Sequence, residues 1–553
     1  MRGGFVACLG GNSERIDHVV DRLRWHRGNA VRYHGNGLEV AAYVDAVEGP
    51  RMDSHGGNSI LVHGGPAIPL TELQRNGTRF AALEWNCELL RATRDPMGLA
   101  PLFYRIMGDA LWLSTEVALL ASLATSRPDL DALSARAAFV PLDERTGWLG
   151  IHRVLPGSTL EIAIPSLRMR SSRYWFPEQH FATYRGSYRE ALDEFQARFD
   201  TAVRRCFEPG SAILLSGGLD SAAVAATATA CTSGRGLPHL LHVHYPTLPK
   251  THEESYAAAV ATSIGAPLHT LSGRLTPWDI GAELDMHGIP YNWLPYGMDE
   301  PALAHIAGAG IGIALDGHDG DGVLGPPGRG IWGNLILDGQ FRQAWRSFRR
   351  YGARRALRGV AADFVPPGLR PRRFIRPTYM HAVAPYFCDP LSELIMSDDI
   401  YRWRLPRGLW RARQIQPLLP RAVISFEQKE IEAASHGIDL RHPFADRALV
   451  EFLISLPCAI KSDPGRAKPV LVDAMASVLP EIIHERRKSD YMTAVRERVD
   501  PATCVELVRA SKVRLPQIDY TRLFDDGDSN PENIPLFLLV NLARVHEFAR
   551  RAQ

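Results

Sequence analysis

The pattern of hydrophobic and polar positions changes about a third of the way along the chain. Before this point, apolar and polar residues alternate over short runs such as 38–44 and 110–114, which is typical of β-strands. After it, amphipathic stretches alternate with short apolar runs, which favours a parallel sheet covered by helices. The chain is therefore predicted to have an α/β fold with two domains, 1–175 and 190–553, the second ending in a mostly helical segment.

The second domain is expected to begin with helices and buried strands in alternation. Helices are predicted at 188–206 and 253–264, and strands at 212–215, 239–245, 267–271 and 310–315. Ligands of such sheets bind outside the carboxyl ends of the strands. The turns that follow the strands at 212–215 and 310–315 are therefore the expected positions of a binding site.

The first of these turns is the hexapeptide Ser216-Gly217-Gly218-Leu219-Asp220-Ser221, followed by an alanine-rich helix. Glycines let backbone N–H groups close on phosphate oxygens, and a helix N-terminus adds a partial positive charge. The turn lacks the lysine of a Walker loop and is not a GxGxxG fingerprint. It resembles the SGGxDS pyrophosphate loop of enzymes that split ATP into AMP and pyrophosphate. That resemblance implies that ATP is bound by Leu215, Ser216, Gly217, Gly218, Asp220 and Ser221; the alternative is a glycine-rich turn without a ligand.

The second turn, Asp316-Gly317-His318-Asp319-Gly320-Asp321, is acidic and rich in glycine. If both turns share one edge of the sheet, Gly317 would lie against the nucleotide, and Asp220 and Asp321 would hold Mg²⁺ between the phosphates. One or two carboxylates plus phosphate oxygens is the usual setting of this cation. The alternative is a solvated acidic turn.

Composition narrows the class of protein. The chain has 553 residues, 45% of them hydrophobic, and a net charge of +2, which argues against a general nucleic-acid binder. No apolar run approaches the length of a membrane span. Seven cysteines are scattered without a CxxC pair, so neither a zinc site nor a disulfide framework is indicated, and a cytoplasmic location is expected.

Lysine is scarce in this chain, because only six of its 63 basic residues are lysine: Lys250, Lys429, Lys461, Lys468, Lys488 and Lys512. Where arginine is the usual cation, a lysine can be present for a compact charge that the planar guanidinium does not provide. Lys468 and Lys488 are the two candidates for such a role, and a solvated surface cation is the alternative for each.

Three further segments extend the resemblance over nearly the whole chain. They are 94–104 (RDPMGLAPLFY), 114–116 (STE) and 437–446 (GIDLRHPFAD), which resemble the RDPxGxxPLYY, SSE and GxExRxPFLD segments of the asparagine synthetase B superfamily. The resemblance implies a first domain of the class II glutamine amidotransferase type, an Ntn-hydrolase-like αββα sandwich. It also implies a second domain of the ATP pyrophosphatase type.

One feature departs from the glutamine-hydrolysing relatives, which need a cysteine at position 2. The sequence begins Met1-Arg2-Gly3-Gly4. Without that thiol no acyl-enzyme forms and no ammonia is released from glutamine. Cys8 is not expected to substitute, so the first domain is expected to be a structural remnant.

The branches of this superfamily that lack glutaminase activity close rings with an amine of the substrate itself. They are the β-lactam and carbapenam synthetases and the lasso-peptide macrolactam cyclases. His318, where β-lactam synthetases have tyrosine, and the arginine-rich segment 341–377 favour the cyclase, although that segment is equally typical of an exposed amphipathic helix. The cyclase would imply a precursor peptide, a leader-binding protein and a leader peptidase as partners. A small-molecule lactam synthetase, an ammonia-dependent amide synthetase and a silent scaffold remain as alternatives.

Catalytic roles follow from the same resemblance. His318 is the candidate base that takes a proton from the attacking amine, with Glu427 or Glu430 as orienting or alternative bases. Otherwise His318 only contacts ribose or closes the turn. Lys488 corresponds to the catalytic lysine of lactam synthetases, and Lys468 to their second phosphate-site lysine.

Overall fold

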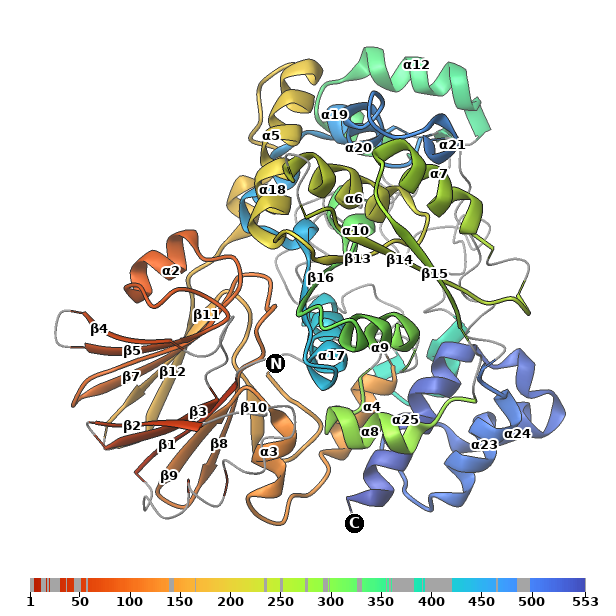
Figure 1. Ribbon diagram of the computed structural model, residues 1–553. Helices are drawn as coiled ribbons and strands as arrows, with labels where there is room; N and C mark the ends of the chain where they lie inside the picture. Colours follow the sequence, from red (N-terminus) through yellow and green to blue (C-terminus); the bar gives the residue numbers. More distant parts are fainter. Residues whose placement is uncertain are drawn as a thin grey trace.

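The computed structural model contains two stacked β-sheets, then a third sheet flanked by helices, and a helical region that includes the C-terminus (Figure 1). The structure describes residues 4–10, 16, 19, 30–35, 37–43, 51–55, 58–138, 144–164, 166–232, 236–248, 252–273, 277–291, 297, 299–325, 331–354, 356–357, 360, 382–389, 391–392, 420–463, 466–484 and 498–552. Every structural statement below concerns these residues.

The first two sheets are antiparallel and pack face to face. One has the strand order β10-β8-β9-β1-β3-β2 and the other β12-β11-β7-β6-β5-β4. Their strands are β1 (Gly4–Leu9), β2 (Ala30–Gly35), β3 (Leu38–Tyr43), β4 (Arg51–His55), β5 (Asn58–His63), β6 (Ala81–Trp85), β7 (Leu89–Arg94), β8 (Phe103–Met107), β9 (Ala110–Ser114), β10 (Ile151–Arg153), β11 (Ser158–Ala163) and β12 (Arg168–Arg173).

The alternation of side chains along each strand builds the layers of this sandwich. In β1, Phe5, Ala7 and Leu9 point into the core between the sheets, whereas Val6 and Cys8 point to the outer face. Helix α3 (Val117–Ser122) covers that outer face, and α2 (Leu70–Asn76) covers the outer face of the second sheet. The predicted αββα sandwich is therefore confirmed.

The third sheet is parallel throughout, with the order β15-β14-β13-β16-β17. Its strands are β13 (Ala212–Leu214), β14 (His239–His244), β15 (Leu268–Ser272), β16 (Ile313–Leu315) and β17 (Asp439–Arg441). One face packs on α5 (Tyr188–Cys206), α6 (Leu219–Cys231), α7 (Glu254–Ile264), α18 (Arg447–Ser455) and α20 (Pro469–Ala474), and the other on α9 (Glu300–Gly308) and α17 (Pro420–Ser435). The prediction of a parallel α/β sheet is confirmed.

Further helices complete the structure. They are α4 (Leu130–Ala137), α8 (Ile280–His287), α10 (Gly320–Leu324), α11 (Ile331–Leu337), α12 (Phe341–Tyr351), α19 (Cys458–Lys461), α21 (Glu481–His484), α23 (Pro501–Ala510), α24 (Tyr520–Ser529) and α25 (Leu536–Arg551). Helices α4, α8, α23, α24 and α25 share one hydrophobic core, so an N-terminal helix packs among C-terminal ones. None of the helices in the described ranges has the length and apolarity needed to cross a bilayer.

Most predicted bounds agree with the structure to within a few residues. Helix α5 has the predicted bounds and begins with a capping box, in which Ser187 and Glu190 satisfy each other's backbone N–H groups. The strand predicted at 310–315 is shorter, because β16 begins at Ile313. Gly310 has φ +71° and belongs to the turn that ends α9.

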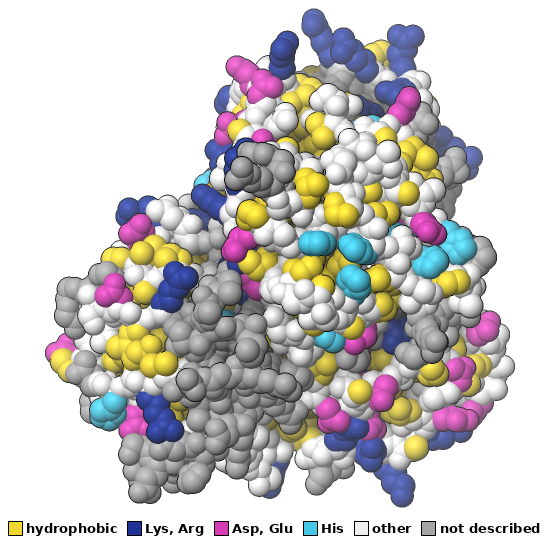
Figure 2. Space-filling view, in the orientation of Figure 1, with side chains coloured by type: hydrophobic (Ala, Val, Ile, Leu, Met, Phe, Trp, Pro, Cys, Tyr) yellow, Lys and Arg dark blue, Asp and Glu magenta, His cyan; other side chains and the backbone are white. Residues whose placement is uncertain are grey.

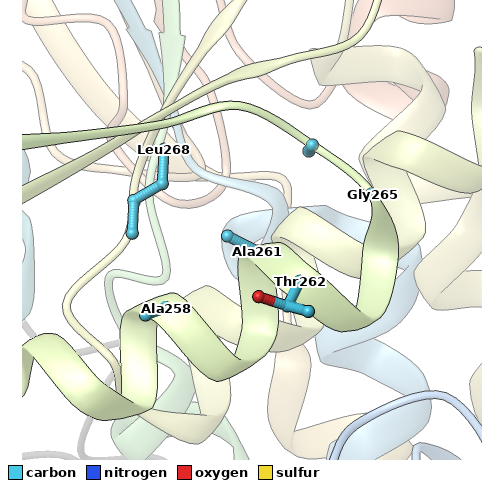
Figure 3. A pocket seen from close by; sticks show the side chains of 6 residues that line it. Ala258, Ala261, Thr262, Gly265 and Leu268 are labelled. Carbon is cyan, nitrogen blue, oxygen red and sulfur yellow. The ribbon is translucent and has the colours of Figure 1, made fainter.

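A shallow apolar depression lies between α7 and β15 (Figure 3). Its walls are Ala258, Ala261, Thr262, Gly265, Ala266 and Leu268. Such a wall offers one hydroxyl and no charge, and it includes neither of the two predicted ligand turns.

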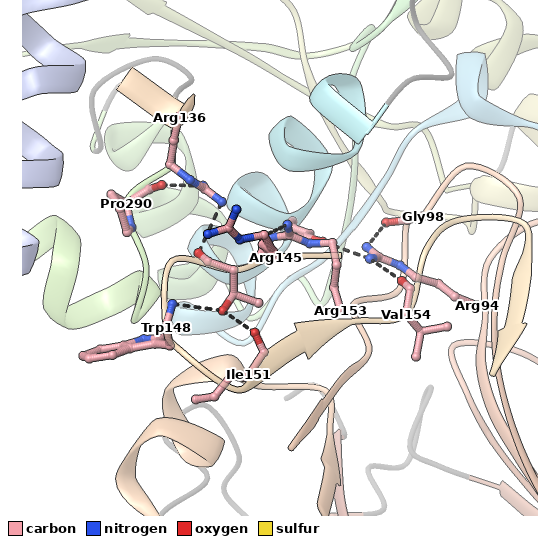
Figure 4. A network of polar contacts seen from close by, with 11 residues as sticks. Arg94, Gly98, Arg136, Arg145, Trp148, Ile151, Arg153, Val154 and Pro290 are labelled. Carbon is pink, nitrogen blue, oxygen red and sulfur yellow. Dashed lines mark hydrogen bonds and ion pairs between the residues drawn. The ribbon is translucent and has the colours of Figure 1, made fainter. Parts of the chain in front are cut away.

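A buried ion-pair network joins the first domain to α17 (Figure 4). Arg94 at the end of β7 donates to Glu427 Oε1 at 2.9 Å, and Arg153 of β10 donates to Oε2 at 3.2 Å. The three side chains are at most 1% exposed. Arg94 also donates to the carbonyl groups of Gly98 and Val154, which fixes its guanidinium.

Glu427 therefore does not suit the role of base that the sequence suggested. Burial acts to raise its pKa, but Arg153 and Arg94 outweigh burial and the pKa is lowered. Both carboxylate oxygens already accept hydrogen bonds from guanidinium groups. We assign Glu427 to the contact between the domains.

Glu427→Gln is expected to lower the free energy of unfolding by about 3–5 kcal/mol, because it leaves two buried guanidinium groups facing a neutral amide. Glu194→Gln is the control, since Glu194 forms an exposed pair with Arg198 on α5 and its loss is expected to cost less than about 0.5 kcal/mol. Urea unfolding followed by circular dichroism measures both. Equal effects of the two substitutions would contradict the structural role of Glu427.

Candidate active site

The two predicted ligand turns leave neighbouring strands and touch each other. β13 and β16 are parallel partners, with Ile213 opposite Leu315, so both turns lie at the carboxyl edge of the sheet. A Cβ atom on Gly317 would lie 2.6 Å from the backbone nitrogen of Ser221, and one on Gly320 would lie 2.5 Å from Cγ of Asp220. Only glycine permits this approach at either position.

Hydrogen bonds within the first turn hold its loop closed around the start of α6. The backbone N–H of Ser216 donates to Oγ of Ser221 at 3.2 Å, and the two hydroxyl oxygens lie 3.0 Å apart. Gly217 has φ +78°, and a Cβ atom there would lie 2.9 Å from the carbonyl oxygen of Glu253. The turn thus has the backbone shape in which N–H groups and a helix N-terminus can face phosphate oxygens.

Lys468 joins the two turns. It stands immediately before α20 with φ +48°, and its Nζ atom contacts Asp220 and lies 2.7 Å from Oδ1 of Asp321. Burial acts to lower the pKa of Lys468, but the two carboxylates outweigh burial and the pKa is raised. The structure therefore brings Lys468, which was predicted separately, together with Asp220 and Asp321, which were predicted as a pair.

A third carboxylate, Asp319, was missed by sequence reasoning. It adopts φ +66°, and one of its carboxylate oxygens is buried without a hydrogen-bond partner. Burial, followed by Asp321 and Asp220, raises its pKa well above the usual range. The signal was present in the sequence, since the second turn contains three aspartates after β16 and only the last was singled out as a metal ligand.

The carboxylates of the two turns fit a hard cation such as Mg²⁺, which prefers oxygen ligands. Within the described ranges, no group of three or more His, Cys, Asp or Glu residues is arranged to hold a metal by itself. Asp220 and Asp321 would thus hold Mg²⁺ together with phosphate oxygens of a nucleotide, as one or two carboxylates commonly do.

A second polar cluster lies beside the turns and contains His318. Its Nε2 atom lies 3.0 Å from Oγ of Ser425 on α17, and its ring packs edge-on against Phe426. Asp316 accepts the backbone N–H of His318 at 3.0 Å and lies 2.7 Å from Nδ1 of His442. Each of the two histidine rings therefore has at least one hydrogen-bonded nitrogen.

His318 does not keep the ordinary pKa that made it attractive as a base. Burial and the positive charge of Lys429 lower the pKa of His318 to about 3, although Asp316 acts in the opposite direction. The side chain is therefore neutral at pH 7, and its affinity for a proton is much lower than that of an exposed histidine.

Lys429 is the second functional candidate that sequence reasoning missed. Its Nζ atom lies 2.8 Å from Asp299 and 3.4 Å from Asp316, and these carboxylates outweigh burial and raise its pKa. The argument that a rare lysine can have a specific role holds for Lys429 as much as for Lys468. No motif surrounds it, and its place beside Asp316 comes from the contact between α17 and the second turn.

The remaining candidates lie elsewhere. Glu430 pairs with Arg79 of the first domain at 3.0 Å, and burial raises its pKa to about 7 despite that arginine. Glu430 stands three residues after Glu427, on the side of α17 that faces the first domain. Lys488 lies outside the described residues, as does most of the arginine-rich segment beyond α12.

The asparagine synthase family model matches residues 194–276 and 425–517. These segments include the first turn, most of α17 and Lys468. The resemblance inferred from motifs is thus supported for this domain of the chain. The narrower assignment to the lasso-peptide cyclases stays a prediction.

Curated relatives match this chain at low identity. Amidase chyE of Penicillium rubens is 33% identical over 153 residues, which cover 26% of this chain and 22% of that protein. Amidase chry2 of Gibberella zeae is 22% identical and covers 75% of this chain and 69% of its own length. The glutamine-hydrolysing asparagine synthetase 3 of Bacillus subtilis is 22% identical, with 74% and 66% covered. The chain therefore spans about a fifth of the first relative and about two thirds of the others.

A solved structure of glutamine phosphoribosylpyrophosphate amidotransferase of Bacillus subtilis, complexed with ADP and GMP, is also similar to this chain. It has 12% sequence identity and a TM-score of 0.22, and the match covers 62% of this chain and 79% of that one.

Gly317→Ala is expected to weaken binding of MgATP at least tenfold, because the added methyl group meets backbone of the first turn rather than a movable side chain. Gly312→Ala is the matched control, since a Cβ atom there meets nothing within 4 Å. Titration calorimetry with a non-hydrolysable ATP analogue measures both variants. Unchanged affinity in Gly317→Ala would show that the two turns do not form the nucleotide site.

The lowered pKa of His318 predicts a pH dependence of stability. The unfolded state takes up a proton near pH 6.5 and the folded state only near 3, so the stabilisation is present above about pH 6.5 and is lost progressively as the pH falls towards 3. Between pH 7.5 and 5, the melting temperature of His318→Asn is expected to fall less than that of the wild type. His34→Asn, at a side chain that is 74% exposed, is the control and should follow the wild type. Parallel curves for wild type and His318→Asn would contradict the burial of a neutral His318.

Proposed function

We propose that this chain is an ATP-dependent, AMP-forming macrolactam synthetase. Its substrate would be a precursor peptide, in which an Asp or Glu side-chain carboxylate is joined to the N-terminal amine as in lasso-peptide cyclases. The observation that carries the proposal is the convergence of Asp220, Asp321 and Lys468 where the two turns meet. The asparagine synthase match supports amide-forming chemistry driven by ATP.

In the first step an oxygen of the peptide carboxylate attacks the α-phosphorus of ATP. Pyrophosphate leaves, and an acyl-adenylate is formed. The turn 216–221 and the start of α6 would face the departing phosphates, and Lys468 would neutralise their growing charge. Mg²⁺ bound by Asp220 and Asp321 would supply further positive charge between the phosphates.

In the second step the peptide amine attacks the acyl carbon and AMP leaves. The α-ammonium must lose its proton before the attack, and among the described residues beside the two turns His318 is the candidate acceptor. Burial and Lys429 lower the pKa of His318 to about 3. Glu430, whose pKa burial raises to about 7, is instead paired with Arg79 on the side of α17 that faces the first domain. His318 would accept the proton only where the negative charge of the adenylate raises its basicity.

The use of an amine carried by the substrate agrees with the burial of Cys8 in β1. Cys8 is the cysteine of this strand, and it is 4% exposed in the core beneath α3. Its side chain packs in a cluster with Ile16, Val19 and Phe103, so it is not presented to solvent as a nucleophile. Two relatives are named amidases and the third an asparagine synthetase, which fits a shared chemistry at an amide bond.

The decisive experiment incubates the purified protein with ATP, Mg²⁺ and the precursor peptide encoded beside its gene, with and without its leader. AMP and pyrophosphate are measured together with the mass of the peptide. Loss of one water from the peptide with an equal amount of AMP is expected. AMP formed only with a small amino acid, or only with added ammonium, would replace the proposal by a small-molecule lactam synthetase or an ammonia-dependent amide synthetase. No pyrophosphate with any substrate would favour a silent scaffold.

Lys488→Ala is expected to abolish ring closure while leaving the fold intact, because a cation at this position would stabilise the charge that develops in the second step. Lys512→Ala, at another of the six lysines, is the control and should keep wild-type turnover. Ring closure is followed by mass spectrometry, and the fold by circular dichroism. Near-normal turnover in Lys488→Ala would remove this lysine from the mechanism.

A further inference from the structure

Helix α12 carries its large apolar side chains in one row, which we call the aromatic row. Phe341, Trp345 and Phe348 follow each other at spacings of four and three residues, which places them on the same side of a helix. Phe341 and Trp345 are 65% and 60% exposed, and the rings of Trp345 and Phe348 stack with centroids 5.3 Å apart. An exposed apolar row of this kind indicates an interaction surface.

A second row, the arginine row, runs beside the aromatic row. Arg342, Arg346 and Arg349 each follow one of the three aromatic residues by one position, so their row lies about 100° further round the helix. All three are exposed, and none of them pairs with a carboxylate among the described residues. Helix α12 contains a fourth arginine, Arg350, and no acidic residue. The helix therefore separates an apolar side from a basic side.

The remaining side of α12 packs on the molecule. Gln343 donates to the carbonyl oxygen of Ala459 in α19 at 2.8 Å, and Ala344 packs in a cluster with Ile331 of α11 and Cys458 of α19. The helix lies along the upper edge of the molecule, above α19 (Figure 1), and Lys and Arg side chains gather on that edge (Figure 2). The aromatic row and the arginine row therefore face outwards from an outer edge.

A bilayer surface with anionic lipids matches both rows at once. A helix that lies in the interface turns its apolar side towards the acyl chains and keeps its basic side chains at the level of the headgroups. An arginine row about 100° from the aromatic row would then reach the lipid phosphates. A flat surface can also engage a helix at an outer edge without displacing its contact with α19.

Other partners match these features less well. In a symmetric contact between two copies of α12, each arginine row would meet positive charge of its own kind. Nucleic-acid binders neutralise many phosphates and have strongly basic surfaces, whereas the net charge of this chain is +2. An acidic peptide would offer exposed ion pairs, which contribute little, and no extended apolar layer for the aromatic row.

We propose that α12 seats this protein on the surface of a membrane that contains anionic lipids. The aromatic row inserts at the boundary between headgroups and acyl chains, and the arginine row binds lipid phosphates. The helix lies on the membrane and does not cross it. This membrane contact does not rest on the proposed function.

The test measures binding of the purified full chain to lipid vesicles by co-sedimentation. Wild type should bind phosphatidylcholine vesicles that contain phosphatidylglycerol at least about tenfold more tightly than vesicles of phosphatidylcholine alone, because each arginine near an anionic surface adds attraction. Arg342→Gln/Arg346→Gln/Arg349→Gln should lose at least about tenfold in affinity for the anionic vesicles. Phe341→Ser/Trp345→Ser should also lose at least about tenfold, because the aromatic row no longer inserts.

A matched control separates α12 from a general effect of charge. Arg127→Gln/Arg168→Gln/Arg170→Gln removes the same charge from exposed positions of the first domain and should bind the anionic vesicles as the wild type does. Circular dichroism of every variant should match the wild type, because the substituted side chains are exposed. Equal loss of binding in the control variant would overturn the proposal, because any three positive charges would then suffice.

The depth of Trp345 gives a second measurement that does not depend on loss of binding. Lipids brominated on their acyl chains quench the fluorescence of a tryptophan that reaches them. Trp345→Phe keeps the aromatic row and should still bind the anionic vesicles, but it should lose part of the quenching that the wild type shows. Equal quenching in both proteins would contradict insertion of the aromatic row.

The competing partners are measured with the same variants. A labelled peptide of Glu, Asp and Phe stands for an acidic protein partner, and an oligouridylate stands for a nucleic acid. Tighter binding of either probe than of the anionic vesicles, lost with the arginine row, would overturn the proposal in favour of that partner. Absence of binding to the anionic vesicles would overturn it as well.

Discussion

The buried carboxylate of Glu427 between Arg94 and Arg153 is the interaction on which the arrangement of the two domains depends. A charge at 0% exposure is tolerated only when its partners are held in place, and here the guanidinium groups come from two strands of the first domain. The contact fixes α17 against that domain. Arg79 repeats it one helical turn later, where it pairs with both Glu430 and Asp439.

Helix α17 transmits this constraint to the candidate active site, because its two sides face different parts of the molecule. Glu427 and Glu430 face the first domain, whereas Ser425 and Lys429 contact His318 and Asp316 in the second turn. A shift of the helix on one side therefore moves hydrogen-bonding partners on the other. The first domain, expected from the sequence to be only a remnant, supports the helix that lines the site.

Close packing of the two turns is a separate constraint at the phosphate site. Gly317 and Gly320 allow the second turn to lie on Asp220 and Ser221, and Lys468 then neutralises Asp220 and Asp321. Three carboxylates and one ammonium group in so small a space leave Asp319 with a strongly raised pKa. A nucleotide bound with its cation would complete the balance of charge at this site. The cation would stabilise the ionised carboxylates, and the positive charges together would offset the negative charge of the phosphates.

Local patterns in the sequence determined the helices and strands, because hydrophobic periodicity and turn residues act over only a few neighbouring positions. Helix α5 and strand β9 have their predicted bounds, and both ligand turns follow strands as expected. The motif and the scarcity of lysine also identified Asp220, Asp321 and Lys468. Only the tertiary structure decided that Glu427 belongs to a contact between domains, that Lys429 stands beside Asp316, and that burial lowers the pKa of His318 to about 3. Burial and charge pairing depend on residues hundreds of positions apart, as Arg94 and Glu427 are, and no local pattern encodes which of them meet.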